Sequence, residues 1–155
     1  MPKPFHGSCL CKAIEFQVEA DPVSVSTCHC LNCKKFTGTV FTTSVIFPGG
    51  SSTITKGTPA TYHDANQDSG NALTRVFCPN CSSPLYIIGG DVGKTLAVFY
   101  SALDDFNVPV DPHPAEGGDV KRTAVRPTLE YYVKDRVSWV APVPGAEQAQ
   151  TRPGQ

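Results

Sequence analysis

Residues 28 to 33 read Cys28-His29-Cys30-Leu31-Asn32-Cys33, and a cysteine pair stands on either side of this stretch in the chain. The first pair is Cys9-Leu10-Cys11 and the second is Cys78-Pro79-Asn80-Cys81. The seven cysteines are one fewer than two complete four-cysteine zinc sites require. A four-thiolate zinc site is closed, whereas three thiolates leave one tetrahedral position open. The count therefore predicts two zinc ions, one structural and one that accepts an outside ligand.

Metal binding explains these cysteines better than disulfide bonds do. Their number is odd, the pairs are tightly spaced, and residues 1–6 lack the apolar run of a signal peptide. No stretch of the sequence approaches the length of a membrane span. We therefore expect a cytoplasmic protein whose thiols stay reduced, without a membrane partner.

Composition favours a mainly β protein with many turns. The chain has 155 residues, which is typical of one domain, and it contains 14 prolines and 13 glycines. Its formal net charge is −1, and no basic run is longer than Lys34-Lys35. A nucleic-acid partner is not expected, because that function needs many basic residues clustered on one face.

Short strands are predicted along most of the chain. Ile14, Phe16 and Val18 alternate with polar residues, which is typical of a half-buried strand over 13–19. Further strands are expected at 40–47, 52–56, 58–62, 73–77, 85–88 and 95–101, with loops at 63–71 and 104–119.

The end of the chain divides into a closing segment and a tail. Residues 129–140 are expected to complete the fold, with Val133, Val137 and Trp139 as anchors. Residues 141–155 have no apolar pattern and are predicted to be disordered. The domain prediction is one zinc domain over 1–140 followed by this tail.

Spacing suggests which cysteines share an ion. Cys9 and Cys11 can offer two sulfurs from one face of an extended segment, and Cys78 and Cys81 can do so from a tight turn. Together they form the predicted structural site, which would tie two distant segments together. The remaining three cysteines, Cys28, Cys30 and Cys33, can wrap the second ion from one short loop. A mixed site that combines a middle cysteine with an outer pair remains an alternative.

A zinc ion held by three thiolates suits sulfur chemistry. Thiolates donate electrons strongly, so they make zinc a weaker activator of water than three histidines would. Such a zinc favours a fourth sulfur, which it holds deprotonated. The alternative is a closed site whose fourth ligand is water or a side chain, with His63, His113, Asp104 and Asp105 as candidates. His29 is expected to point away from the ion.

The sequence resembles the glutathione-dependent formaldehyde-activating enzyme family, which also includes a vertebrate centromere-associated protein. The motifs that carry the resemblance are 7–11, 28–35, 36–38, 45–48, 77–81, 103–105, 126–128 and 139–140. The resemblance implies a tent-like arrangement of small antiparallel sheets with zinc-binding knuckles. It also implies a structural zinc at Cys9, Cys11, Cys78 and Cys81 and a catalytic zinc at Cys28, Cys30 and Cys33. The implied activity is a carbon–sulfur lyase reaction that joins formaldehyde to glutathione.

The chain departs from the family pattern in two places. A histidine is typical after the Pro-Thr near the end, where this chain has Leu129-Glu130-Tyr131. The segment 106–124 is also longer than usual and carries His113. Two alternatives therefore stay open, a specialised lyase that acts on a larger sulfur adduct and a non-catalytic zinc-stabilised binding module.

Other site residues are weaker candidates. The carboxylates of glutathione would need cations, and the sequence offers Lys34, Lys35, Lys56 and Arg75. Polar residues that could serve as a general base are Tyr62, His63 and Glu130.

Overall fold

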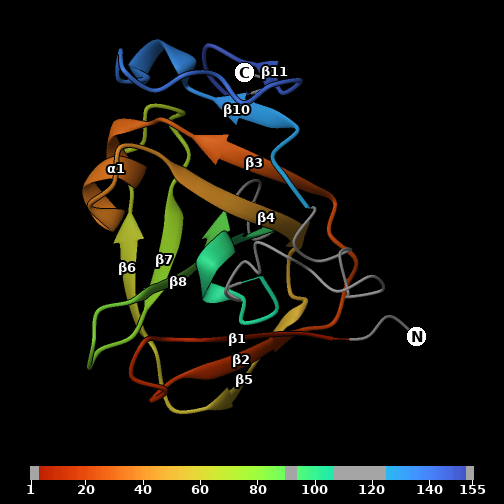
Figure 1. The fold of residues 1–155 in the computed structure, drawn as a ribbon. Coiled ribbons are helices and arrows are strands. Elements are labelled where there is room, and N and C mark those ends of the chain that lie inside the picture. Colours follow the sequence, from red (N-terminus) through yellow and green to blue (C-terminus); the bar gives the residue numbers. More distant parts are fainter. Residues whose placement is uncertain (1–3, 90–93, 107–124, 153–155) are drawn as a thin grey trace, which may run out of the picture.

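The computed structural model describes residues 4–89, 94–106 and 125–152. The chain forms two β-sheets, and the smaller one lies at the end of the molecule opposite the C-terminal strands (Figure 1). This antiparallel sheet has the strand order β1-β2-β5. Its strands are β1 (Phe5–Ser8), β2 (Glu15–Val18) and β5 (Ser52–Lys56).

The larger sheet has eight strands in the order β11-β10-β3-β4-β9-β8-β7-β6. The strands are β3 (Ser24–Cys28), β4 (Thr42–Pro48), β6 (Ala60–Asp64), β7 (Leu73–Phe77), β8 (Pro84–Gly89), β9 (Thr95–Phe99), β10 (Leu129–Tyr131) and β11 (Glu147–Gln148). Among the described strands, the parallel pairs are those of β10, with β3 on one side and β11 on the other. The predicted mainly β fold of antiparallel sheets is confirmed.

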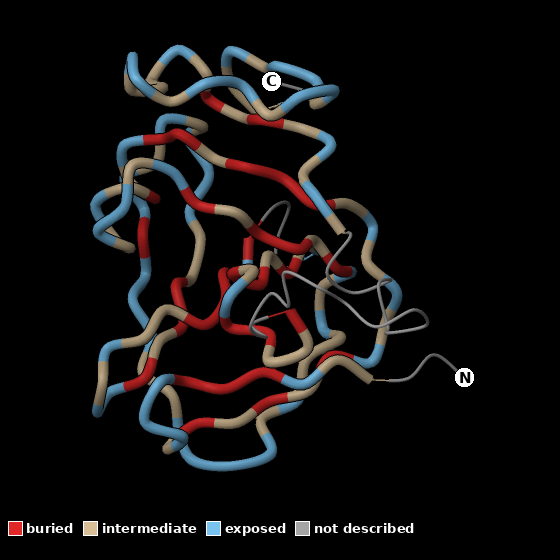
Figure 2. Tube along the Cα trace, viewed as in Figure 1, coloured by how far each residue is buried: buried red, intermediate tan, exposed pale blue. Residues whose placement is uncertain are grey.

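The core lies where the two sheets face each other, and buried segments gather there (Figure 2). Phe16 and Val18 of β2 are buried, as their alternation predicts. Gly7 of β1 lies against the ring of Phe16, because a Cβ atom at this position would come within 2.2 Å of the ring carbon Cζ. The two strands can therefore pack closely only with glycine here.

A short helix, α1 (Leu31–Thr37), begins within the middle cysteine cluster. Cys30 is its N-cap, since the Cys30 sulfur accepts a hydrogen bond from the amide of Cys33. The helix ends at Gly38, whose left-handed φ of 71° is favourable for glycine. The sequence predicts a loop here, because a helix of this length has too few residues to show a helical period.

The C-terminal segment differs from its prediction. Residues 141–152 are ordered, and they include β11, which pairs with β10. Polar bonds hold the segment, so its lack of an apolar pattern did not indicate disorder. Trp139 is 74 % exposed, so the prediction that it anchors the fold is wrong. After β10 the chain forms a 3-10 helix, η3 (Val133–Asp135), rather than continuing as a strand.

The two predicted loops have different outcomes. The first, 63–71, begins with the last two residues of β6 and continues without further strands up to β7. Most of the second, 104–119, lies outside the described residues, as do His113 and nearly all of the long segment 106–124. Before it, η2 (Tyr100–Ala102) follows β9. No helix in the described part of the chain is long and apolar enough to cross a membrane.

Candidate metal centres

Four of the cysteines meet at a junction between the two sheets. Their sulfur atoms lie within 4.8 Å of one another, and the residues are Cys9, Cys11, Cys78 and Cys81. The first pair follows β1, and the second lies in the turn between β7 and β8. The structure therefore brings the two outer cysteine pairs together, as the spacing predicts. All seven cysteines are free thiols.

The spacing of these sulfurs fits a tetrahedral ion. The Sγ atoms of Cys9 and Cys11 are 3.6 Å apart, and those of Cys11 and Cys78 are 3.8 Å apart. Zinc–sulfur bonds of about 2.3 Å at tetrahedral angles put neighbouring sulfurs roughly 3.8 Å apart. The amide of Ile14 donates to Cys9 Sγ at 3.2 Å, as expected where sulfurs carry negative charge.

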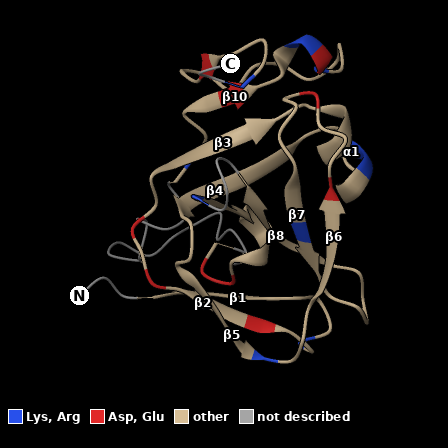
Figure 3. Cartoon of the chain, turned by 180° about the vertical axis from the view of Figure 1, so that it is seen from behind, with Lys and Arg blue, Asp and Glu red and all other residues tan. Residues whose placement is uncertain are grey.

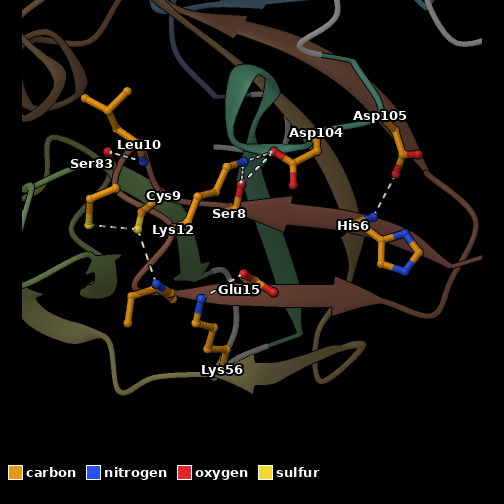
Figure 4. Close-up of polar contacts among 12 residues, drawn as sticks. His6, Ser8, Cys9, Leu10, Lys12, Glu15, Lys56, Ser83, Asp104 and Asp105 are labelled. Atoms are coloured by element: carbon orange, nitrogen blue, oxygen red, sulfur yellow. Dashed lines mark hydrogen bonds and ion pairs between the residues drawn. The ribbon is translucent and has the colours of Figure 1, made fainter.

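Polar contacts from two other parts of the chain brace this cluster (Figure 4). Ser8 donates to Asp104 at 2.6 Å, and Lys12 bonds both side chains. The amide of Leu10 donates to Ser83 Oγ at 3.0 Å, which joins the two cysteine turns directly. Asp104 accepts a hydrogen bond from Ser8, and Asp105 accepts one from the His6 amide, so both aspartates bind β1. The suggestion that either one is the fourth ligand of the second cluster is therefore wrong.

Each of the two cysteine turns contains a residue with left-handed backbone. Lys12 has φ 62° directly after Cys11, and Ser82 has φ 63° directly after Cys81. The two turns thus reverse the chain in the same way. In each turn a non-glycine residue has a backbone conformation that only glycine adopts without strain. The repeat follows from the shared task of turning two sulfurs toward one point.

The other three cysteines form a second cluster at the start of α1. Cys28 ends β3, Cys30 caps the helix and Cys33 lies in its first turn. Their ligand atoms are also within 4.8 Å of one another. The described residues contribute no fourth cysteine, histidine or carboxylate to this group. The mixed grouping that the sequence left open is therefore not the one that the fold assembles.

Arg75 of β7 lies beside the second cluster. Its Nη1 is 3.9 Å from Cys33 Sγ, and its Nε donates to Asp64 at 2.8 Å. The guanidinium carbon lies 5.0 Å from the centre of the Phe36 ring. Hydrogen bonds from Cys28 and Cys30 lower the pKa of the Cys33 thiol, and the charge of Arg75 lowers that pKa further. The surroundings thus favour a thiolate at Cys33.

His29 points away from the second cluster, as expected. It is fully buried, and its Nε2 lies 2.8 Å from Oε1 of Glu130. The other carboxylate oxygen of Glu130 accepts hydrogen bonds from the Val143 amide at 2.8 Å and from Gln148 Nε2 at 2.6 Å. Burial alone would raise the pKa of Glu130, but its bond to His29, these hydrogen bonds and the nearby Arg136 lower the pKa to about 2. Glu130 is therefore a structural anion.

A cavity of about 150 Å³ opens beside the second cluster. All three cysteines line it, together with Arg75 and, from the C-terminal part of the chain, Tyr131, Tyr132 and Arg152. Apolar residues of the sheet complete the wall, including Ile46, Leu73 and Ala97. A second, more polar cavity of about 400 Å³ shares Cys30, Gln67 and Tyr132 with the first. The second cluster thus faces space for a ligand.

Most of the other predicted site residues lie elsewhere. Among the described lining residues of the first cavity, Arg75 is the one that the sequence analysis had proposed as a cation. Lys34 donates to the backbone of Asp135 instead, and Lys56 pairs with Glu15 on the smaller sheet. Figure 3 shows Lys and Arg spread over several elements, including α1, β5 and β7. Tyr62 and His63 are exposed on β6 and do not line the cavity.

A family profile described as glutathione-dependent formaldehyde-activating enzyme matches residues 4–135. The chain belongs to this family. An uncharacterized lyase of Schizosaccharomyces pombe is 29 % identical over 82 residues, which cover 53 % of this chain and 56 % of the relative. The chain thus spans little more than half of that curated relative.

A solved structure has a fold similar to that of this chain. It is the crystal structure of a Rhodobacter sphaeroides protein, with a TM-score of 0.52 and 18 % sequence identity. The alignment covers 69 % of this chain and 91 % of that one. At this identity the likeness bears on the fold alone.

The family match ends before the segment that contributes Arg152 to the cavity. Sequence reasoning missed Arg152, Tyr131 and Tyr132 as lining residues. The one signal in the sequence was Glu130, a single acid within a short apolar stretch. Its carboxylate accepts hydrogen bonds from Val143 and Gln148, and these bonds help to hold the C-terminal segment in place.

Proposed function

We propose that this protein is a zinc-dependent carbon–sulfur lyase of the S-(hydroxymethyl)glutathione synthase type. It would add a thiol, glutathione or a similar one, to a small aldehyde such as formaldehyde, or cleave such an adduct. The observation that carries the proposal is that all three cysteines of the second cluster line a cavity. Family membership and the name of the yeast relative as a lyase support it.

The two clusters fit two zinc ions per chain. Cys9, Cys11, Cys78 and Cys81 would hold a structural ion in a closed site, and the sulfur spacings of 3.6 and 3.8 Å suit it. Cys28, Cys30 and Cys33 would hold the catalytic ion. A zinc ion held by three thiolates would bind a thiol at its fourth position and keep it deprotonated.

The reaction needs no oxidant or reductant. The sulfur of the thiol forms a bond to the carbonyl carbon, the carbonyl π electrons move to oxygen, and the thiol proton ends on that oxygen. The chain contributes by placing the two reactants side by side in a cavity with apolar walls. The charge of Arg75 lies 3.9 Å from the sulfur of Cys33, so it reduces the excess negative charge of the cluster.

The second cavity can accommodate the rest of a longer thiol. It shares Cys30 with the first cavity, so a peptide thiol could extend from one cavity into the other. The same observation favours a related function, in which a specialised lyase acts on a larger sulfur adduct. The two differ in substrate size and share the same sulfur chemistry.

The test is a titration of cobalt-substituted protein with glutathione. Cobalt(II) replaces zinc and has visible absorption bands that report its ligands. We expect saturable changes in the thiolate-to-metal and d–d bands of one of the two ions. Isotope-labelled formaldehyde should then exchange with its glutathione adduct faster in the presence of the zinc protein, as measured by exchange NMR.

The matched control is Cys30→Ser, loaded with cobalt at the four-cysteine site only. Its bands should not respond to glutathione. If wild-type protein binds two cobalt ions and its bands ignore thiols, the second site is closed. The binding-module alternative would then replace the lyase.

A further inference from the structure

Arginine supplies the only charge, apart from the cysteines, among the described residues that line the first cavity. Arg75 and Arg152 both line it, and none of its described lining residues is an aspartate or glutamate. The two arginines come from distant parts of the chain, β7 and the C-terminal segment (141–152). A cavity with this composition favours an anion.

Arg75 has a donor that the protein leaves unused. The residue is 1 % exposed, and Asp64 and Cys33 engage its Nε and Nη1. Its Nη2 is buried and has no hydrogen-bond partner among the described residues. A buried donor without a partner is costly, so a ligand that accepts a hydrogen bond from Nη2 would remove this cost.

Arg152 is half-buried and lines the same cavity as Arg75. It shares this cavity with Tyr131 and Tyr132. No ion pair joins Arg152 to a carboxylate within the described part of the chain. Its charge is therefore available to a ligand.

The C-terminal segment is fixed firmly enough to position this charge. Ala149 donates its amide to the carbonyl of Glu130 at 2.8 Å, and its own carbonyl accepts from the Val133 amide at 3.1 Å. Val143 and Gln148 bind the carboxylate of Glu130, as described above. These bonds end only a few residues before Arg152.

We propose that the first cavity binds a thiol with a carboxylate a few bonds from its sulfur, and that Arg152 and Nη2 of Arg75 bind this carboxylate. The inference rests on the proposed function, since that function places the sulfur at the three-cysteine cluster. The size of the cavity agrees, because about 150 Å³ holds a molecule the size of benzene. The ligand is a small mercapto acid, or the corresponding end of a longer thiol.

The experiment compares two small thiols on the cobalt-substituted full chain. Mercaptoacetate carries a carboxylate, and 2-mercaptoethanol has a neutral hydroxyl in its place. Each is titrated against wild type, Arg152→Ala and Arg75→Lys, and the d–d absorption gives both dissociation constants. Since the ratio of these constants is compared between variants, the different acidities of the two thiols cancel.

Wild type should prefer mercaptoacetate, and Arg152→Ala should weaken its binding about tenfold, because a charge-assisted hydrogen bond is lost. Binding of 2-mercaptoethanol should stay within about twofold, since it lacks the anion. Arg75→Lys keeps the positive charge but removes Nη2, so it should also lower the preference for mercaptoacetate over 2-mercaptoethanol. The control is Arg126→Ala, an exposed arginine that does not line the cavity, and it should leave the ratio unchanged.

The outcomes separate the two proposals. If 2-mercaptoethanol binds and Arg152→Ala leaves the ratio unchanged, the anion subsite is overturned while the open thiol site stands. If neither thiol binds wild type, the proposed function fails and the subsite fails with it. Should Arg75→Lys not fold, as judged by circular dichroism, Arg152→Ala alone decides.

Discussion

Cys30 belongs to the second cluster and also caps α1, so a substitution there can separate metal binding from folding. Its sulfur accepts the amide hydrogen of Cys33 at 3.2 Å. Serine is among the preferred N-cap residues, so Cys30→Ser should keep the helix while it weakens the metal site. We expect the bound zinc to fall from two ions to one and the unfolding temperature to change by only about 2–4 °C.

Cys78→Ser provides the contrast. Cys78 is fully buried and belongs to the cluster that joins the two sheets. Because structural zinc contributes on the order of 10 kcal/mol to small domains, loss of this site should prevent stable folding. Circular dichroism and metal analysis of both variants check this pair. Equal loss of structure in Cys30→Ser would show that both sites are structural.

Ser82 offers a residue-scale test of backbone strain. Its φ of 63° costs a non-glycine residue about 1–2 kcal/mol of strain. Glycine removes this strain, but its greater freedom in the unfolded chain destabilises the folded state by about 0.5–1 kcal/mol. Ser82→Gly should therefore stabilise the protein by about 0.5–1 kcal/mol in urea unfolding of the zinc-loaded form. Ser82→Ala keeps the Cβ atom and should change little. A destabilised glycine variant would contradict the strain argument.

At the scale of elements, Glu130 joins β10, β3 and the C-terminal segment. Its carboxylate is 1 % exposed and binds His29, Gln148, Val143 and Arg136. Its pKa lies at about 2 rather than 4.5 because the bonds to His29, Gln148 and Val143 and the charge of Arg136 outweigh burial. A folded-state pKa below the unfolded value stabilises the protein above about pH 4.5, and this contribution is lost as the pH falls toward 2.

Glu130→Gln should remove most of this contribution at neutral pH. The pKa difference corresponds to about 3 kcal/mol at about 1.4 kcal/mol per unit, so we expect a loss of about 2–3 kcal/mol at pH 7. The difference between wild type and variant should shrink as the pH falls below 4.5. The two proteins are compared in urea at each pH at which metal analysis still shows the same bound zinc in both. A difference that does not change with pH would contradict the assignment of Glu130 as a charged hub.

The same elements show what a sequence can predict. Alternation located β2 because one face of that strand is buried, and cysteine spacing grouped both clusters because sulfur ligands must converge. The order of the C-terminal segment depends instead on polar bonds to the Glu130 carboxylate and on backbone pairing with β10, and neither leaves a period in the sequence. Arg152 was missed for that reason. Arg75 was proposed as a cation, but its burial beside Cys33 depends on how β7 packs against α1.

At the scale of the whole molecule, β7 connects two clusters that differ in their number of cysteines. This difference predicts the order in which the two clusters lose metal. Arg75 in β7 touches Cys33, and Cys78 follows the end of the same strand. The four-cysteine site fixes the junction of the sheets, whereas the three-cysteine site lies on one short segment. With one ligand fewer, the three-cysteine site should bind zinc more weakly.

A chelator titration should therefore proceed in two steps. The first zinc should leave with little change in far-ultraviolet circular dichroism, and the second should leave together with the fold. Trp139 is a poor reporter because it is 74 % exposed, so dichroism and amide NMR are the suitable measurements. Cys30→Ser should show the second step alone. Unfolding during the first step would mean that the three-cysteine site carries the fold, and the division into one structural and one catalytic ion would be wrong.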